Sequence, residues 1–399
     1  MELDVYLYRG HLGQTVIPVP LALAEAFNLD GKAILTAQVA ANELAGRLGA
    51  AITSELLHGH QRSYLQRFAA AICAAKLPSL NQECFAEALA IAMTQPKYPL
   101  HVGEFSSDTK VLSAASSVVE GTRSAFLASE GMTGTRNILE HQGGFYRQFT
   151  LHRNTPQPFL QLGEAWVTET LAFKRYSACA YAQGAIDCIR VLSHENTFEI
   201  SEIKKIEIFT MITALVMEHL AIPHYKSLFT PVNVQFSVAR SVAMALFYKD
   251  LRGYHFTPEN FEKALPTIKN LSKQTDSRHD WKLTIQLLRG VDDGIIEGSS
   301  KHSAGMLEFY RTSPEFRRRF VTMQSLGFRD IPALLALDKK DLVFFLNRFA
   351  RGFHSKVRPT RVRGPLGDLS KLSWRMGARV KLTLASKEVI EAETILPPA

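Results

Sequence analysis

The sequence has little cysteine and no long uninterrupted apolar run. Its four cysteines are scattered and form no CxxC pair, which excludes a disulfide framework and a zinc site built on cysteine pairs. No stretch of about 18 residues is apolar without a charge, and the beginning, MELDVYLYRG, has neither the basic nor the apolar region of a signal peptide. We therefore expect no membrane contact and a cytoplasmic protein.

Internal repeats and low-complexity tracts are also absent, so we expect neither a solenoid nor a disordered chain. The formal net charge is +8, and the excess gathers late, around residues 317–319 and 356–363. No recognisable nucleic-acid-binding motif accompanies these basic residues, so we interpret them as a solvated face and do not expect nucleic acid as a partner. A modest positive charge also suits anionic metabolites.

The chain of 399 residues, 46% hydrophobic and 21% charged, predicts a globular protein of two domains. Its first part carries the apolar periodicity of helices, with prolines near one predicted start and Gly131 and Gly134 after the last predicted end. Helices are expected in two segments of 16–49, separated at Asp30-Gly31, and over residues 64–76, 82–94 and 112–129.

From about residue 168 the pattern changes. Residues 203–208 (IKKIEI) and 379–384 (RVKLTL) alternate apolar and charged side chains, as half-buried strands do, whereas 236–247 predicts a helix. The predicted fold is mainly α, a large all-helical domain with a smaller α+β lid domain. Its divisions are a helical domain over 1–170, the lid over 171–294, an inserted helical segment and basic linker over 295–375, and a terminal lid strand over 376–399.

Two histidines and two lysines are the candidates for chemistry. His11 and His60 stand near the ends of predicted helices, where a histidine can exchange protons near neutral pH. Lys110 precedes a predicted helix, and Lys174 stands at the predicted change of domain. The side chain of lysine is a compact positive charge suited to binding carboxylates. Local pattern alone does not separate these four residues from ordinary surface groups.

Several motifs follow one another in a fixed order through roughly residues 3–250. They are HLGQTVIP (11–18), FAAAICAAKLPSL (68–80) after His60, EALAIAMTQ (87–95), DTK (108–110), FLASEGMTG (126–134), GGFYRQF (143–149), FKRYSAC (173–179), AID (185–187) and FSVARSVAMAL (236–246). Their order resembles the MmgE/PrpD family of 2-methylcitrate dehydratases and cis-aconitate decarboxylases. The weight of the resemblance lies in collinearity, because no single motif has the specificity of a metal signature.

The resemblance implies a large helical domain with a smaller lid, usually in a homodimer, whose cleft binds a small polycarboxylate substrate without a metal or other cofactor. His11 and His60 fall on histidines of the family, Lys110 and Lys174 on its lysines, and Asp4 on an acidic residue of its N-terminal block. By this resemblance a histidine moves a proton beside a carboxylate or assists departure of a hydroxyl, while the lysines hold carboxylates.

This sequence departs from the family pattern at several positions. The family's acid-rich stretch is reduced to LDVYLYRG, Ser113 and Gln183 stand where histidines are usual, and Arg240 replaces a tyrosine of the lid. These changes remove groups that transfer protons and keep groups that bind anions. The guanidinium of Arg240 would itself donate two parallel hydrogen bonds to a substrate carboxylate.

Three hypotheses follow. The leading one is a metal-independent lyase or isomerase that dehydrates, decarboxylates or epimerises a small di- or tricarboxylic acid. The alternative is a catalytically impaired family member that binds an anion or a partner subunit. A third makes the basic stretch 313–381 an interaction module for an acidic surface or nucleic acid.

Overall fold

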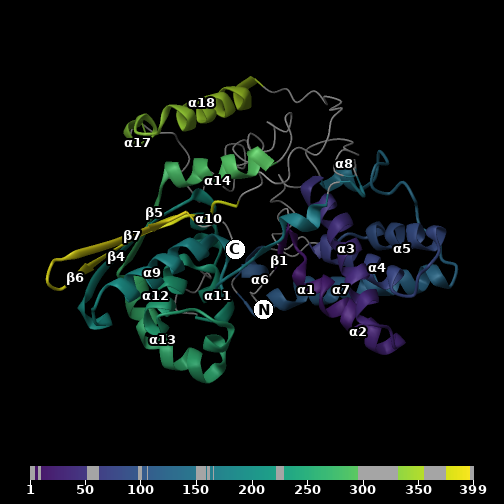
Figure 1. The fold of residues 1–399 in the computed structure, drawn as a ribbon, viewed down its shortest axis with the longest axis horizontal. Coiled ribbons are helices and arrows are strands. Elements are labelled where there is room, and N and C mark those ends of the chain that lie inside the picture. Colours follow the sequence, from purple (N-terminus) through teal and green to yellow (C-terminus); the bar gives the residue numbers. More distant parts are fainter. Residues whose placement is uncertain are drawn as a thin grey trace.

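Helices dominate the fold, and a small mixed sheet lies on one side of it (Figure 1). The computed structural model describes residues 5–7, 10–51, 63–97, 101–105, 107–149, 159, 162–164, 166–221, 229–294, 331–354 and 374–395. Within this part, the expected mainly α class with a smaller α+β part is confirmed.

A helical bundle forms the first part of the chain. Its helices are α1 (Gly13–Val16), α2 (Pro18–Phe27), α3 (Gly31–Ala51), α4 (Ser63–Lys76), α5 (Gln82–Thr94), α6 (His101–Phe105), α7 (Lys110–Ser129) and α8 (Phe145–Phe149). Local signals set several ends: Pro18 opens α2, Asn28 ends it in the left-handed conformation, and the Asn81 side chain accepts from the Cys84 amide at the start of α5. The helices expected in this part are confirmed.

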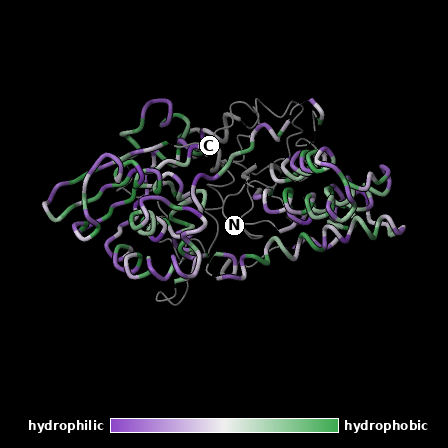
Figure 2. Tube along the Cα trace, turned by 60° about the horizontal axis from the view of Figure 1, so that its bottom comes forward, coloured by the Kyte–Doolittle hydropathy of each residue, from purple (hydrophilic) through white to green (hydrophobic). Residues whose placement is uncertain are grey.

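Helix α4 is the centre of the bundle, since its side chains from Ser63 to Ala75 are all buried. Helix α7 lies closely against it through small residues. A Cβ atom built on Gly121 would stand 2.1 Å from the carbonyl oxygen of Arg67, so only glycine fits at this crossing. Figure 2 shows hydrophobic and hydrophilic residues interspersed along the helices of the protein.

A three-stranded antiparallel sheet, which the sequence did not predict, joins the start of the chain to the end of the bundle. Its strands β1 (Val5–Leu7), β2 (Gly10–His11) and β3 (Ala172–Phe173) run in the order β2-β1-β3. Just before β3, the Glu43 carboxylate accepts hydrogen bonds from the amides of Val167 and Thr168 at 3.0 and 2.6 Å. This contact fixes the chain where it leaves the bundle.

The α+β part is built on a four-stranded sheet of order β5-β4-β6-β7. Strand β4 (Ile203–Thr210) pairs in parallel with β5 (Thr275–His279) and antiparallel with β6 (Ala378–Leu384), which also pairs with β7 (Val389–Thr394). The strands expected at 203–208 and 379–384 are thus confirmed as β4 and β6. The helices of this part are α9 (Gln183–Glu195), α10 (Ile212–Ala221), α11 (Pro231–Phe236), α12 (Val238–Tyr248), α13 (Pro258–Lys273) and α14 (Trp281–Gly294).

Part of the expected inserted segment packs onto this unit. Helices α17 (Ile331–Leu335) and α18 (Lys339–His354) form a small apolar cluster with α14, in which the rings of Trp281 and Phe345 lie 5.4 Å apart. Both helices fall within the inserted helical segment expected over 295–375. The rest of that segment, residues 295–330 and 355–373, lies outside the described residues.

Candidate functional site

Helix α11 lies at the junction between the bundle and the α+β unit, next to α6 and α12 (Figure 1). Three of its residues each hold a different segment that carries a candidate residue. The Nζ atom of Lys110 lies 5.3 Å from the ring centroid of Phe236, and the Gln235 carbonyl accepts from the amide of Cys179 at 2.8 Å. The side-chain oxygen of Asn233 accepts from Arg240 Nη1 at 2.7 Å. One short helix therefore links Lys110, Arg240 and the segment that follows Lys174.

Lys110 begins α7 at the edge of the bundle, and its side chain is buried. The ring of Phe236 also meets Phe105 of α6 edge to face, with centroids 4.9 Å apart. The Lys110 ammonium thus lies against an aromatic wall, which attracts a cation through the ring quadrupole. The rings of Phe105 and Phe236 thus lie between α6 and α11, on the side of α11 that Lys110 contacts.

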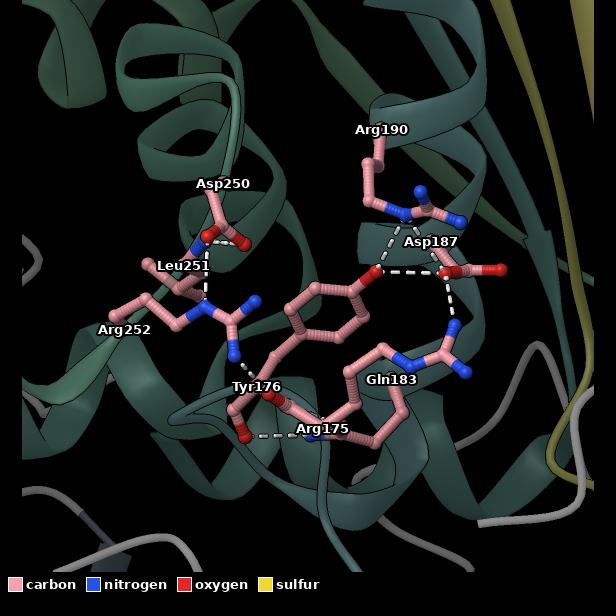
Figure 3. A network of polar contacts seen from close by, with 8 residues as sticks. All are labelled: Arg175, Tyr176, Gln183, Asp187, Arg190, Asp250, Leu251 and Arg252. Carbon is pink, nitrogen blue, oxygen red and sulfur yellow. Dashed lines mark hydrogen bonds and ion pairs between the residues drawn. The ribbon is translucent and has the colours of Figure 1, made fainter. Parts of the chain in front are cut away.

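Lys174 directly follows β3, and its side chain is also buried. The irregular segment after it is tied down by a polar network, shown in Figure 3. The hydroxyl of Tyr176 donates to Asp187 Oδ1 at 2.6 Å, while Arg175 Nη1 and Arg190 Nε donate to the same oxygen at 3.1 and 3.4 Å. The network anchors the backbone beside Lys174 to α9.

Gln183 supplies the second anchor of this segment (Figure 3). Its Oε1 accepts from the Tyr176 amide at 2.9 Å, and its Nε2 donates to the Tyr176 carbonyl at 3.0 Å. Longer bonds at 3.3 and 3.4 Å reach the carbonyls of Ala178 and Cys179. At the position where the resemblance expects a histidine, this side chain is occupied with backbone groups.

Arg240 lies buried near the start of α12. Its guanidinium carbon is 4.0 Å from the ring centroid of Phe229, which adds a cation–π contact to its bond with Asn233. Nearby, the Glu218 carboxylate accepts from the Ser237 hydroxyl at 2.7 Å and from the Ala239 amide at 3.1 Å. Glu218 therefore caps α12 and provides a negative charge close to the guanidinium.

Burial shifts the titration of this group of side chains. It lowers the pKa of Arg240, against the opposing effect of the Glu218 charge, and raises the pKa of Glu218, against the hydrogen bonds that this carboxylate accepts. Burial, assisted by the bond to Asp187, raises the pKa of Tyr176 to about 12. Tyr176 thus stays protonated at neutral pH and donates to a carboxylate.

His11 reaches the same junction through the three-stranded sheet. In that sheet Tyr6 pairs with His11 on one side and with Ala172, two residues before Lys174, on the other. The His11 side chain is buried, and its carbonyl accepts from Gln66 Nε2 of α4 at 2.8 Å. The sheet therefore brings His11 next to β1, whose other neighbour, β3, ends directly before Lys174, although the spacing of the two residues along the chain does not show this.

Two other predicted site residues, Asp4 and His60, lie outside the described residues, so their roles stay predictions. Ser113 is buried on the face of α7 that meets α4. Sequence reasoning missed two acidic residues near the junction, the buried Glu104 on α6 and the half-buried Glu218 on α10. No sequence signal marked them, because a single acidic residue in a short helix looks like a surface group.

Among the described residues, no three histidine, cysteine or acidic side chains lie close enough together to hold a metal ion. In the same part of the chain, no helix has both the length and the apolar character needed to span a membrane. All four cysteines are free thiols in the structure.

A helical bundle and a smaller α+β unit that meet at buried cations have the layout of a protein that binds its ligand between two domains. Comparison with known proteins agrees with this layout. The sequence model of the MmgE/PrpD N-terminal domain matches residues 3–157, and that of the C-terminal domain matches residues 176–289. The chain belongs to the MmgE/PrpD family.

The cis-aconitate decarboxylase of Homo sapiens is a relative of this chain. The two are 28% identical over 192 residues, a match that covers 44% of this chain and 38% of that protein. The chain therefore matches well under half of the relative's length. The expected division at residues 170 and 171 stays a prediction.

Proposed function

We propose that the protein is a lyase or isomerase that acts, without a metal ion, on a small di- or tricarboxylic acid. The observation that carries the proposal is the burial of Lys110, Lys174 and Arg240, each at most 6% exposed, on segments that contact α11. Burying charged groups costs free energy, so cations are rarely gathered in this way unless they serve a structural or ligand-binding purpose. Family membership supports a dehydratase or decarboxylase type of chemistry.

In the proposed reaction the cations hold carboxylates of the substrate and stabilise negative charge as it develops beside one of them. His11 is the candidate within the described residues for moving the proton at the adjacent carbon. His60 and Asp4 keep the roles that the resemblance implies. The proposed substrate class is a polycarboxylate because several buried cations match several carboxylates.

A second candidate is a family member that binds an anion or a partner subunit without turnover. The geometry of Gln183 favours it, since an amide bonded to backbone groups neither accepts nor releases a proton. This candidate predicts that the cations still bind polycarboxylates while no bond to carbon changes.

The proposal also includes a homodimer in the cytoplasm. The family resemblance supports the dimer, and the location stays a prediction. The basic stretch 313–381, largely outside the described residues, carries the third hypothesis and is tested by the salt dependence of any binding to an acidic partner.

The decisive experiment incubates the protein in D₂O with citrate, 2-methylcitrate or cis-aconitate and follows each acid by NMR. Proton chemistry incorporates deuterium or forms product, and His11→Ala and His60→Ala abolish both. Lys110→Met and Lys174→Met are expected to weaken ligand binding, measured as ligand-induced thermal stabilisation. Lys263→Met, on the exposed face of α13, is the matched control and leaves both readouts unchanged.

Ligand-induced stabilisation without exchange or product, lost in Lys110→Met, would favour the binding-only candidate. No stabilisation by any of these acids, with Lys110→Met and Lys174→Met indistinguishable from Lys263→Met, would contradict both.

A further inference from the structure

Gln66 is a fully buried polar side chain on α4, the central helix of the bundle. Its Oε1 accepts a hydrogen bond from the Thr15 hydroxyl at 2.5 Å, and its Nε2 donates to the carbonyl of His11 at 2.8 Å. Burying an amide in an apolar core costs free energy unless its polar atoms are bonded, and here both ends of the amide are bonded. The side chain therefore ties the segment from His11 to Thr15 to the core.

The two bonds fix which way the amide of Gln66 points. A carbonyl oxygen accepts and cannot donate, so Nε2 and not Oε1 has to face the carbonyl of His11. Turning the amide over would set two acceptor oxygens against each other. A glutamine donates and accepts at once, whereas an ionised glutamate only accepts and a methionine offers only a weak acceptor. The glutamine at this position is thus matched to both of its partners.

The segment that Gln66 holds changes from strand to helix. His11 ends β2, and Thr15 lies in the short helix α1. Strand β2 has two residues, and among the described strands it pairs only with β1 at the edge of the three-stranded sheet. Such a short edge strand gives His11 few ladder hydrogen bonds. The amide of Gln66 adds a bond at each end of the segment, from a helix that belongs to the core.

The place of His11 matters because this histidine is the candidate for proton transfer within the described residues. A proton moves efficiently only when donor and acceptor come within about 2.6–3.2 Å. A displacement of about 1 Å can therefore lower a rate about 100-fold. The backbone of His11 carries the imidazole, so a bond that fixes its carbonyl also fixes the point from which the ring extends.

We propose that Gln66 is a positioning residue, which sets the place of His11 for proton transfer through the bond to its carbonyl. The proposal rests on the proposed function for the role of His11. Thr15 acts together with Gln66, because its hydroxyl holds the amide in the orientation that donates to the carbonyl. Gln66 acts through His11 and not on the substrate, so its loss is expected to change the rate of turnover and not the affinity, which the buried cations supply.

Gln66→Met tests the proposal, because methionine has a similar length but cannot donate to the carbonyl. The probes are citrate, 2-methylcitrate and cis-aconitate, and NMR in D₂O follows deuterium incorporation or product formation over a range of concentrations. We expect kcat to fall about 100-fold while KM changes less than about threefold. The control is Leu271→Ala, a buried core position on α13, which loses stability but keeps both kcat and KM per folded molecule.

Gln66→Glu provides a readout that a purely structural role does not move. Burial raises the pKa of a carboxyl group above its usual value of about 4.3. Below that raised pKa the protonated group donates to the carbonyl of His11 and accepts from Thr15, as the glutamine does, whereas the ionised group repels the carbonyl. The kcat of Gln66→Glu should therefore approach that of the parent at acidic pH and fall away from it as the pH rises. The ratio for Gln66→Met should not depend on pH.

The imidazole of His11 can also be observed directly, with or without turnover. Labelling with ¹³C at the imidazole Cε1 gives signals from the 13 histidines, and the signal lost in His11→Ala identifies His11. We expect Gln66→Met, and to a smaller degree Thr15→Val, to shift or broaden this signal. Thr15→Ser, which keeps the hydroxyl, and Leu271→Ala are expected to leave it in place.

An unmoved His11 signal in folded Gln66→Met overturns the positioning role, and so does a raised KM with an unchanged kcat, which would place Gln66 in substrate binding. If Gln66→Met does not fold, Thr15→Val decides in its place, and a His11 signal equal to that of Thr15→Ser overturns the role. A parent that turns over none of the three acids contradicts the proposed function, and the His11 signal then decides the role of Gln66 by itself.

Discussion

Replacing Gln183 by leucine tests how the segment beside Lys174 is held. The variant keeps the approximate volume but removes the acceptor for the Tyr176 amide and the donor to the Tyr176 carbonyl. That carbonyl keeps another donor, the amide of Ala178 at 2.8 Å, whereas the buried Tyr176 amide is left without this acceptor. The main cost is therefore one buried donor that has lost its partner.

Such an orphaned group costs about 1–3 kcal/mol, and the lost bond to the carbonyl adds about 1 kcal/mol. We expect Gln183→Leu to lower the free energy of unfolding by about 2–4 kcal/mol, measured by urea titration followed by circular dichroism. Gln82→Leu, at an exposed position on α5, is the control and is expected to change it by less than about 0.5 kcal/mol.

A looser segment also displaces Lys174, so the variant is expected to bind polycarboxylates more weakly than the parent even where both are folded. If Gln183→Leu unfolds at the same urea concentration as the parent, the amide does not hold this segment and the reasoning is wrong. If stability falls but ligand binding is unchanged, the segment is held without affecting Lys174.

Three further predictions concern the rest of the molecule. Gly121→Ala is expected to destabilise the protein by about 1–3 kcal/mol in urea titrations, because the Cβ atom of alanine would overlap the carbonyl of Arg67. This loss outweighs the gain of about 1 kcal/mol that alanine brings in helix propensity. An unchanged or raised stability would show that α4 and α7 can move apart without cost. Hydrogen bonds from the Gly134 amide and the Arg136 side chain lower the pKa of Glu87, so its stabilising contribution is present above the unfolded pKa of about 4.3 and is lost as the pH falls through the folded value. The stability difference between the parent and Glu87→Gln should therefore shrink as urea titrations move from neutral to acidic pH, and a constant difference would contradict the assignment. Burial raises the pKa of Cys73 and of Cys188 to about 12. A thiol reagent should therefore label Cys84, which is not buried, first in the native protein, and all four cysteines after denaturation. Rapid labelling of several thiols in the native protein would refute the buried placement of the other three.

The longer helices of the bundle, α2 to α5 and α7, and the two alternating strands could be predicted from the sequence, because their signals are local. Proline at the start of α2, asparagine before α5 and the apolar period of α4 act within a few residues. The collinear motifs likewise sufficed to place the chain in its family. Candidate residues could be named in the same way, as members of motifs.

Only the tertiary structure decided how these pieces meet. Strand β5 (TDSRH) has no apolar alternation and forms because β4 supplies a parallel partner. The pairing of β1 with β3, which joins Val5 to Phe173, and the contact of Lys110 with Phe236 of α11 bring together segments far apart in the sequence, which no local pattern encodes. Burial of Glu104 has the same origin, since a side chain is buried by distant segments that pack over it and not by its neighbours in sequence.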